Sequence, residues 1–278
     1  MSRWDAWIAD WVASGGEPRG EPELDALRAR WLGRKRVVDA RTALPEPYVG
    51  DPLAPDLLGV VLAHNPGPAV PDQRMPDARL PTLVAQGRPW SELARTWDVA
   101  PETVRWWTGM ADAVRTMLDE PPADGLPAIV GIDLLPWHSE KRVPFAPDAR
   151  AAAWLREQVL LPALRIAERG RLRIRTKAGE RPLVVAVHEH VWLALDALGA
   201  REVLRLDPRV PSRADVFGDV WPRNAEGDLA ARHFALCCVP VAEGEELLVL
   251  ATWSEGGYLQ PGRDFREVMR WVLERALA

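Results

Sequence analysis

The chain has 278 residues, of which 47% are hydrophobic and 27% are charged, and its formal net charge is −5. This composition is typical of a globular protein with a sizeable core, and the acidic balance argues against a broad basic surface that coats nucleic acid. No run of about 18 apolar residues occurs, and the first residues lack the basic start and apolar segment of a signal peptide. We therefore expect a cytoplasmic protein without a membrane span.

The first 39 residues predict a helical extension. Residues 2–13 and 23–34 have the pattern of two helices, separated by the turn-prone stretch SGGEPRGEP. The proline-rich segment 43–56 is expected to be an ordered loop that leads into a second unit. That unit is predicted to extend from residue 40 to residue 278.

Short apolar runs rich in Val, Leu and Ile predict four buried strands, at 57–63, 126–135, 182–187 and 246–253. Helical patterns and one weaker strand candidate accompany them, at 90–119, 147–168, 190–198 and 264–278 for the helices and 202–207 for the strand. The alternation of strand and helix predicts a three-layer α/β/α sandwich with a mostly parallel sheet of four or five strands.

Polar side chains follow each of the four apolar runs. The first run ends in HNPGP, the second in PWHSEK, the third in HEH and the fourth in SEGGYLQP. Parallel strands place their carboxyl ends at one edge, where open α/β sheets bind ligands. We therefore expect four of the five histidines to gather there, namely His64, His138, His188 and His190.

Asn65 is the first candidate for chemistry. It lies between a strand and two prolines, so its amide has little freedom and can orient a water or a substrate edge. Gly67 allows a ligand to approach the backbone closely. The alternative is a plain turn, because Asn-Pro-Gly is turn chemistry in any protein.

The segment LLGVVLAHNPGP is similar to the first motif of the uracil-DNA glycosylase superfamily, in its mismatch-specific and single-strand-selective branches. Asn65, Pro66 and Gly67 match that motif directly, whereas His64 replaces a hydrophobic residue. LPEPYVGDP and LLPWHSEK resemble further segments of bacterial members. The family's His-Pro-Ser-like loop has no counterpart, because LATWSEGGYLQP carries Trp253 and Ser254 at that place.

The resemblance implies a DNA base glycosylase that hydrolyses the N-glycosidic bond of a flipped, damaged or modified base without a metal or cofactor. It gives Asn65 the task of positioning the hydrolytic water, and His138 is the expected donor to the departing base. The expected substrate-binding residues are His64, Pro66, Gly67, Asp133, Trp137, Ser139, His188, Trp253 and Ser254. The expected contacts to DNA phosphates are Lys141, Arg173, Arg175 and Lys177.

Two alternatives stay open. Residues 90–107 resemble a helix-turn-helix, which would make the protein a non-catalytic DNA-binding regulator, although two packed helices beside the crevice fit the adjacent Trp106 and Trp107 better. The acidic net charge favours a hydrolase that acts on a small nucleotide. The HEH stretch has two histidines in metal-ligand spacing but no evident third ligand, so we expect no metal there.

Overall fold

The computed structural model describes residues 2–17, 22–32, 42–74, 77–139, 147–176, 179–206 and 232–254. The helices are α1 (Ser2–Ala13), α2 (Pro22–Leu32), η1 (Pro71–Gln73), α3 (Arg79–Ala85), α4 (Trp90–Arg95), α5 (Pro101–Met117), α6 (Ala149–Leu155), η2 (Arg156–Leu160), α7 (Leu161–Ala167) and α8 (Glu189–Ala197). The strands are β1 (Tyr48–Val49), β2 (Gly59–Ala63), β3 (Ile129–Asp133), β4 (Arg173–Thr176), β5 (Gly179–Val187), β6 (Arg201–Leu206), β7 (Arg232–Ala242) and β8 (Glu245–Ser254).

The described strands form one mixed sheet of eight strands, in the order β1-β3-β2-β5-β8-β7-β6 with β4 beside β5. Strands β3, β2, β5 and β8 run parallel to one another, while β1, β4, β6 and β7 are antiparallel to their neighbours. Among the described strands, four antiparallel pairs therefore outnumber three parallel pairs. The prediction of a three-layer sandwich with a mostly parallel sheet of four or five strands is wrong.

The missed strands explain this error. β7 and β8 form a hairpin around Glu243 and Gly244, and Gly244 has φ +71, which favours glycine. From Phe234 to Val239, β7 is buried at every residue, so it lacks the apolar–polar alternation that marks an antiparallel strand with one solvated face. β1 has only two residues. β1 is too short to produce a pattern, whereas the apolar run of β7 indicates a buried strand but not its antiparallel direction.

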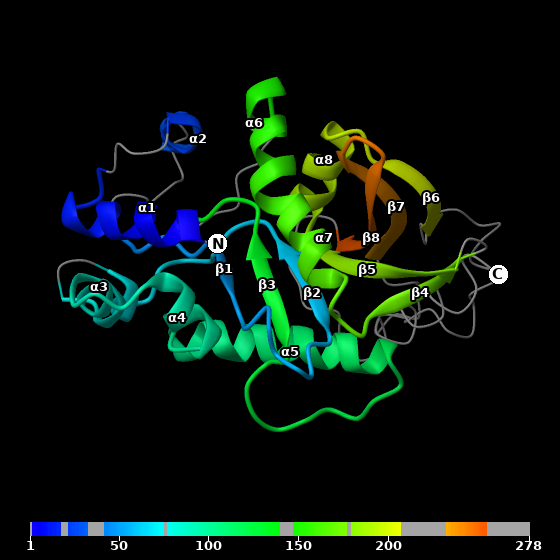
Figure 1. The fold of residues 1–278 in the computed structure, drawn as a ribbon, viewed down its shortest axis with the longest axis horizontal. Coiled ribbons are helices and arrows are strands. Elements are labelled where there is room, and N and C mark those ends of the chain that lie inside the picture. The colour runs from blue at the N-terminus through cyan, green and yellow to red at the C-terminus, as the bar shows by residue number, and fades with distance from the viewer. Residues whose placement is uncertain are drawn as a thin grey trace, which may run out of the picture.

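Helices α5, α7 and α8 pack against the strands of the sheet. Trp107 of α5 lies across Gly131 of β3, where a Cβ atom would come within 2.5 Å of the indole ring. Helix α7 contacts β2 and β5, and α8 contacts β5 and β8. In Figure 1, α1 to α4 lie on the side of the sheet where β1 forms the edge, and β6 and β7 lie on the other side. None of the described helices is long and apolar enough to cross a membrane.

Helix α1 shares the core of the sheet-containing unit. Its Trp7, Ile8 and Trp11 are buried, and Asp5 accepts hydrogen bonds from the backbone N–H and the hydroxyl of Ser91, both at 2.7 Å. The Trp7 ring also meets the Trp137 ring edge-on at 6.4 Å. The expected boundary between residues 39 and 40 lies outside the described residues, as does the expected helix at 264–278.

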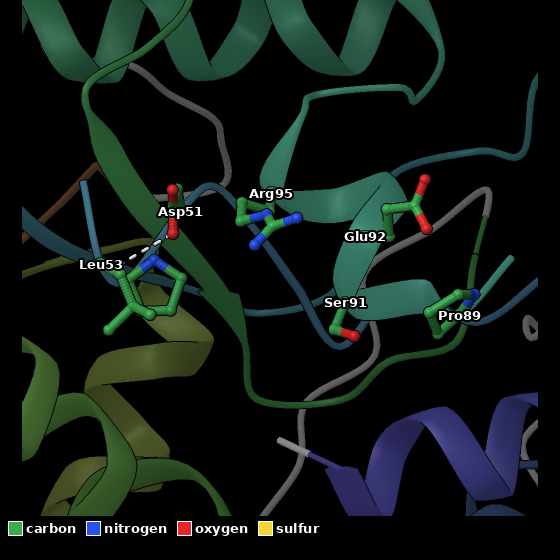
Figure 2. Close-up of a pocket in the computed structure, with 7 residues that line it drawn as sticks. Asp51, Leu53, Pro89, Ser91, Glu92 and Arg95 are labelled. Atoms are coloured by element: carbon green, nitrogen blue, oxygen red, sulfur yellow. Dashed lines mark hydrogen bonds between the residues drawn. The ribbon is translucent and has the colours of Figure 1, made fainter.

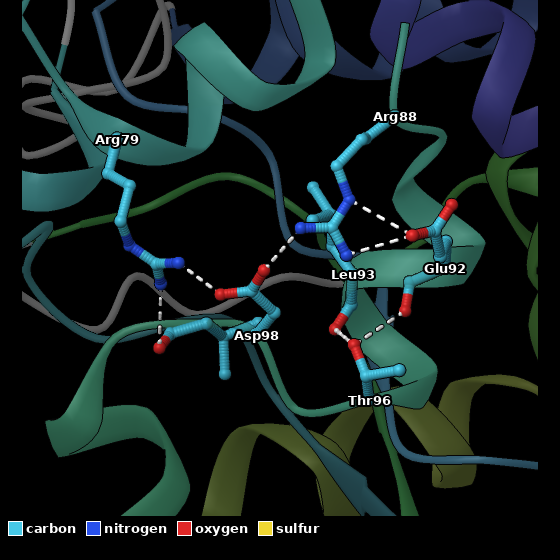
Figure 3. A network of polar contacts seen from close by, with 7 residues as sticks. Arg79, Arg88, Glu92, Leu93, Thr96 and Asp98 are labelled. Carbon is cyan, nitrogen blue, oxygen red and sulfur yellow. Dashed lines mark hydrogen bonds and ion pairs between the residues drawn. The ribbon is translucent and has the colours of Figure 1, made fainter. Parts of the chain in front are cut away.

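An ion-pair network fixes the turn between α4 and α5 (Figure 3). Asp98 in this turn accepts hydrogen bonds from Arg79 and from Arg88, the latter at 2.7 Å, and Arg88 also pairs with Glu92 at 2.9 Å. The hydrogen bond from Arg79 is the main reason why the pKa of Asp98 lies below its usual range. The network connects α3 to the turn between α4 and α5. This turn belongs to residues 90–107, the candidate helix-turn-helix. Because Trp107 is buried against β3, that face of α5 is occupied by the protein itself.

Both cysteines are buried free thiols in β7. Burial is the main cause that raises the pKa of the Cys237 thiol to about 12, and its Sγ lies 3.7 Å from the Val249 carbonyl oxygen. The thiolate is the reactive form, so we expect no modification of the folded protein by an aromatic disulfide reagent and full modification after unfolding in guanidinium chloride. A spectrophotometric thiol titration with and without denaturant measures this, and rapid labelling of the native protein would contradict it.

Candidate functional site

The carboxyl ends of the four parallel strands meet at one edge of the sheet. β3 ends at Asp133, β2 at Ala63, β5 at Val187 and β8 at Ser254. The fifth histidine, His233, also lies at this edge, because β7 begins there and pairs His233 with Trp253. Sequence reasoning missed His233, since it opens an antiparallel strand instead of following an apolar run.

Three imidazole rings form a compact group, called here the histidine cluster (His64, His188 and His190). The ring centroids are 5.1 Å apart for His64 and His190, 4.8 Å for His188 and His190, and 5.8 Å for His64 and His188. His188 Nδ1 accepts the backbone N–H of His190 at 3.0 Å and thereby caps α8. No group of three His, Cys, Asp or Glu side chains within the described ranges has an arrangement that could hold a metal ion.

The backbone of His188 is strained. Its φ is +102, a region that residues with a side chain rarely adopt and that carries a cost of about 1–3 kcal/mol. Such strain persists only where the surrounding structure imposes it. Here it turns the chain sharply from β5 into α8 and brings His188 and His190 beside His64.

The amide of Asn65 is held on both sides. Its Oδ1 lies 2.7 Å from His64 Nδ1, and its Nδ2 donates to the Trp137 carbonyl at 3.3 Å and to the Pro66 carbonyl. An amide oxygen can only accept, so His64 Nδ1 carries the proton in this contact. Asn65 is half-buried, and its orientation is fixed before any ligand arrives.

Backbone hydrogen bonds join the β2 loop (64–67) to the β3 loop (134–139). Leu134 N–H donates to the Ala63 carbonyl at 2.9 Å, and Leu135 N–H donates to the His64 carbonyl at 3.1 Å. The His138 ring contributes as well, with Nδ1 at 3.0 Å from the Gly67 carbonyl oxygen. The two loops therefore behave as one structural unit around Asn65.

A buried acidic group lies behind these loops, and sequence reasoning missed its main member. Glu46 is 3% exposed, and its Oε1 accepts from Gln73 Nε2 at 2.5 Å while its Oε2 lies 3.8 Å from His138 Nε2. Burial raises the pKa of Glu46 to about 7, partly opposed by the hydrogen bond from Gln73. Burial, together with the nearby Glu46, also raises the pKa of Asp133 well above its usual range. The only sequence signal was an acidic residue between two prolines in LPEPY.

The remaining residues expected in the substrate pocket are mostly buried. Trp137 is 1% exposed, and Pro66 and Ser139 are also buried, whereas Gly67 is exposed and has open space where a Cβ would stand. Trp253 is stacked between His233 and Trp192, at centroid distances of 5.3 and 5.0 Å. Ser254 is described only as the last residue of β8, opposite Arg232.

The two described candidates for phosphate contacts, Arg173 and Arg175, lie away from this edge. Arg173 and Arg175 lie on β4, which pairs with the first residues of β5, at the opposite end of that strand from His188. Arg173 donates to the Glu168 carbonyl at 2.6 Å. Lys141 and Lys177 lie outside the described residues.

A cavity of about 320 Å³ lies away from the strand tips (Figure 2). It is lined by Asp51, Pro52, Leu53, Pro89, Ser91, Glu92 and Arg95. Gly50, next to this lining, packs against the Ile129 carbonyl, so the cavity is near the amino end of β3. None of the expected catalytic, substrate-binding or phosphate-binding residues lines it.

No protein-family model matches the chain, and comparisons with curated proteins and with solved structures found no significant similarity. The function must therefore be inferred from the geometry at the carboxyl ends of the parallel strands.

Proposed function

We propose that the protein hydrolyses the N-glycosidic bond of a nucleobase turned out of a DNA strand, with Asn65 holding the attacking water. The observation that supports this most is the fixed amide of Asn65 at the carboxyl end of β2, beside the histidine cluster. Hydrolysis of such a bond needs a water placed against the sugar and donors for the base, which leaves as an anion. A flipped base would occupy the edge above the β2 loop.

We assign the donor to the departing base to other residues than His138, which was the donor expected from the sequence. His138 is 2% exposed, its Nδ1 contacts the Gly67 carbonyl and its Nε2 faces Glu46. It is therefore suited to holding the two loops. His188 and His190 are half-buried and contact His64, so they are the side chains that we assign as donors to the departing base.

Free nucleosides and nucleotides are the second candidate class of substrate, beside a DNA strand. The net charge of −5 and the position of Arg173 and Arg175 away from the edge both favour a substrate with little phosphate backbone. The chemistry at Asn65 would be the same for both classes.

The test is an incubation of the purified chain with single- and double-stranded oligonucleotides that carry uracil, hypoxanthine, mismatched thymine or modified cytosines. Alkali reveals abasic sites, and chromatography detects base release from free nucleosides and nucleotides. We expect abasic sites on at least one oligonucleotide. Base release from small substrates alone would move the substrate class to nucleotides, and no release from any substrate by a folded protein would overturn the proposal.

A further inference from the structure

The cavity next to Gly50 has the size and the lining of a small-molecule site (Figure 2). Its volume of about 320 Å³ lies at the lower end of the range of ligand pockets, which is about 300–1,000 Å³. Its apolar walls come from Pro52, Leu53 and Pro89, and Leu53 is 60% exposed, so it has apolar surface to offer a ligand. The rest of the lining consists of two carboxylates, a hydroxyl and a guanidinium.

The guanidinium of Arg95 is the cation of this cavity that the protein does not neutralise. Arg95 is the last residue of α4, and its side chain makes no hydrogen bond or ion pair among the described residues. Arg88, on the same side of the molecule, is paired with Glu92 at 2.9 Å and with Asp98 at 2.7 Å. The charge of Glu92 is thus balanced from within the protein. A planar guanidinium presents paired N–H donors that match a carboxylate, so Arg95 is available to a ligand that carries one.

The anion of the cavity is Asp51, and its carboxylate is held in place. Its Oδ1 accepts the Leu53 backbone N–H at 2.9 Å, which leaves Oδ2 to a ligand. Ser91 Oγ donates to Asp5 Oδ2 at 2.7 Å, so the lone pairs of this hydroxyl can accept a hydrogen bond. In the view of Figure 2, the Arg95 side chain lies between Asp51 and Ser91. Asp51 and Arg95 both line the cavity, yet they form no ion pair with each other.

We propose that this cavity binds a small zwitterion of the amino-acid type with an apolar side chain. The carboxylate of the ligand binds Arg95, its ammonium group binds Asp51 Oδ2 and Ser91 Oγ, and its side chain lies against the apolar walls. A simple anion would meet the unbalanced charge of Asp51, and a simple cation would meet that of Arg95. The two separated charges therefore select a ligand that carries both signs. The site lies near the amino end of β3, so it is independent of the chemistry proposed at the carboxyl ends of the strands.

Leucine and two fragments of leucine test this proposal. 4-Methylpentanoate is leucine without its ammonium group, and 3-methylbutylamine is leucine without its carboxylate. Each compound is titrated into the ¹⁵N-labelled full chain at slightly acidic pH, and ¹H–¹⁵N spectra follow Arg95 Nε–H and the backbone N–H groups of Leu53 and Ser91. We expect saturable shifts, with leucine bound about tenfold or more tightly than either fragment, because each fragment lacks one charge-assisted contact. Glycine, which lacks the apolar side chain, should also bind more weakly than leucine.

Two variants assign the two charges. Asp51→Asn keeps an acceptor for the Leu53 N–H but removes the negative charge, so leucine should then bind no better than 4-methylpentanoate. Arg95→Gln removes the guanidinium from a side chain without a hydrogen bond among the described residues, so leucine should bind no better than 3-methylbutylamine. The matched control is Arg169→Gln, which removes an exposed guanidinium just after α7 and should leave every affinity unchanged.

The possible results separate the ligand class from the site. Equal affinity of the wild type for leucine and for either fragment would overturn the zwitterion as the ligand. The absence of saturable shifts with all four compounds, or leucine binding that is unchanged in Arg95→Gln, would overturn the site itself. None of these results bears on base release at Asn65, which does not line the cavity, so the failure of one proposal leaves the other intact.

Discussion

Replacing Asn65 with alanine is expected to lower the rate of base release by about 100-fold or more, the range found when one preorganised group is removed from an active site. The structure gives the physical reason. The amide is fixed by His64 and by the Trp137 carbonyl, so it can hold a water without first paying the entropy of being ordered. Single-turnover rates on the best oligonucleotide measure the effect.

The fold should survive this substitution. Asn65 is half-buried, and the hydrogen bonds that it loses contribute about 1 kcal/mol each to stability. The matched control is Gln86→Ala, which removes another amide from the exposed end of α3 and should leave the rate unchanged. An Asn65→Ala protein that unfolds normally in urea and retains full activity would remove Asn65 from the mechanism.

The histidine cluster was predictable, because parallel strands place their carboxyl ends at one edge of the sheet and the sequence shows which residues follow each strand. That prediction requires only that neighbouring buried strands run parallel, and β3, β2, β5 and β8 do so. His64, His188 and His190 then follow from their places directly after two of those strands. The flanking antiparallel strands changed the fold class without moving this edge.

Glu46 was not predictable, because its burial is a tertiary property. Nothing in LPEPY shows that the carboxyl lies against Gln73 and beneath the β3 loop. The burial of His138 is likewise a tertiary property, as is the contact of the neighbouring Trp137 with Trp7 of α1, far away in the sequence. The sequence placed His138 near the site but gave no sign of its burial or of its contact with the Gly67 carbonyl.

The arginines expected to contact phosphates show a different limit of sequence-based prediction. The sequence shows where the arginines lie along the chain, but it does not show to which end of the sheet their strand, β4, is attached. β4 pairs with the amino end of β5, so Arg173 and Arg175 lie at the end of the sheet opposite the histidine cluster. A basic run becomes a phosphate contact only if the topology brings it to the site.

The buried carboxyl of Glu46 is expected to make stability depend on pH in an unusual direction. Its pKa in the folded chain is about 7, above its ordinary value of 4.5, so the folded state binds the proton more tightly than the unfolded state. The contribution of Glu46 to the free energy of unfolding is therefore fully present below about pH 4.5 and is lost as the pH rises through about 7. At about 1.4 kcal/mol per pKa unit, the loss is on the order of 3 kcal/mol, and Asp133 acts in the same direction.

Urea unfolding followed by tryptophan fluorescence between about pH 5 and pH 8 tests this expectation. The wild-type free energy of unfolding should fall across that range, whereas Glu46→Gln should fall less steeply, because a carboxamide has no proton to release and the contribution of Asp133 remains. Glu102→Gln should behave as the wild type, since Glu102 is exposed on α5. Asp98, whose pKa is lowered by Arg79, acts in the opposite sense but only at lower pH, so it does not mask the effect. A parallel fall in the wild type and in Glu46→Gln would mean that another group governs the dependence, and Asp133→Asn would then identify whether it is Asp133.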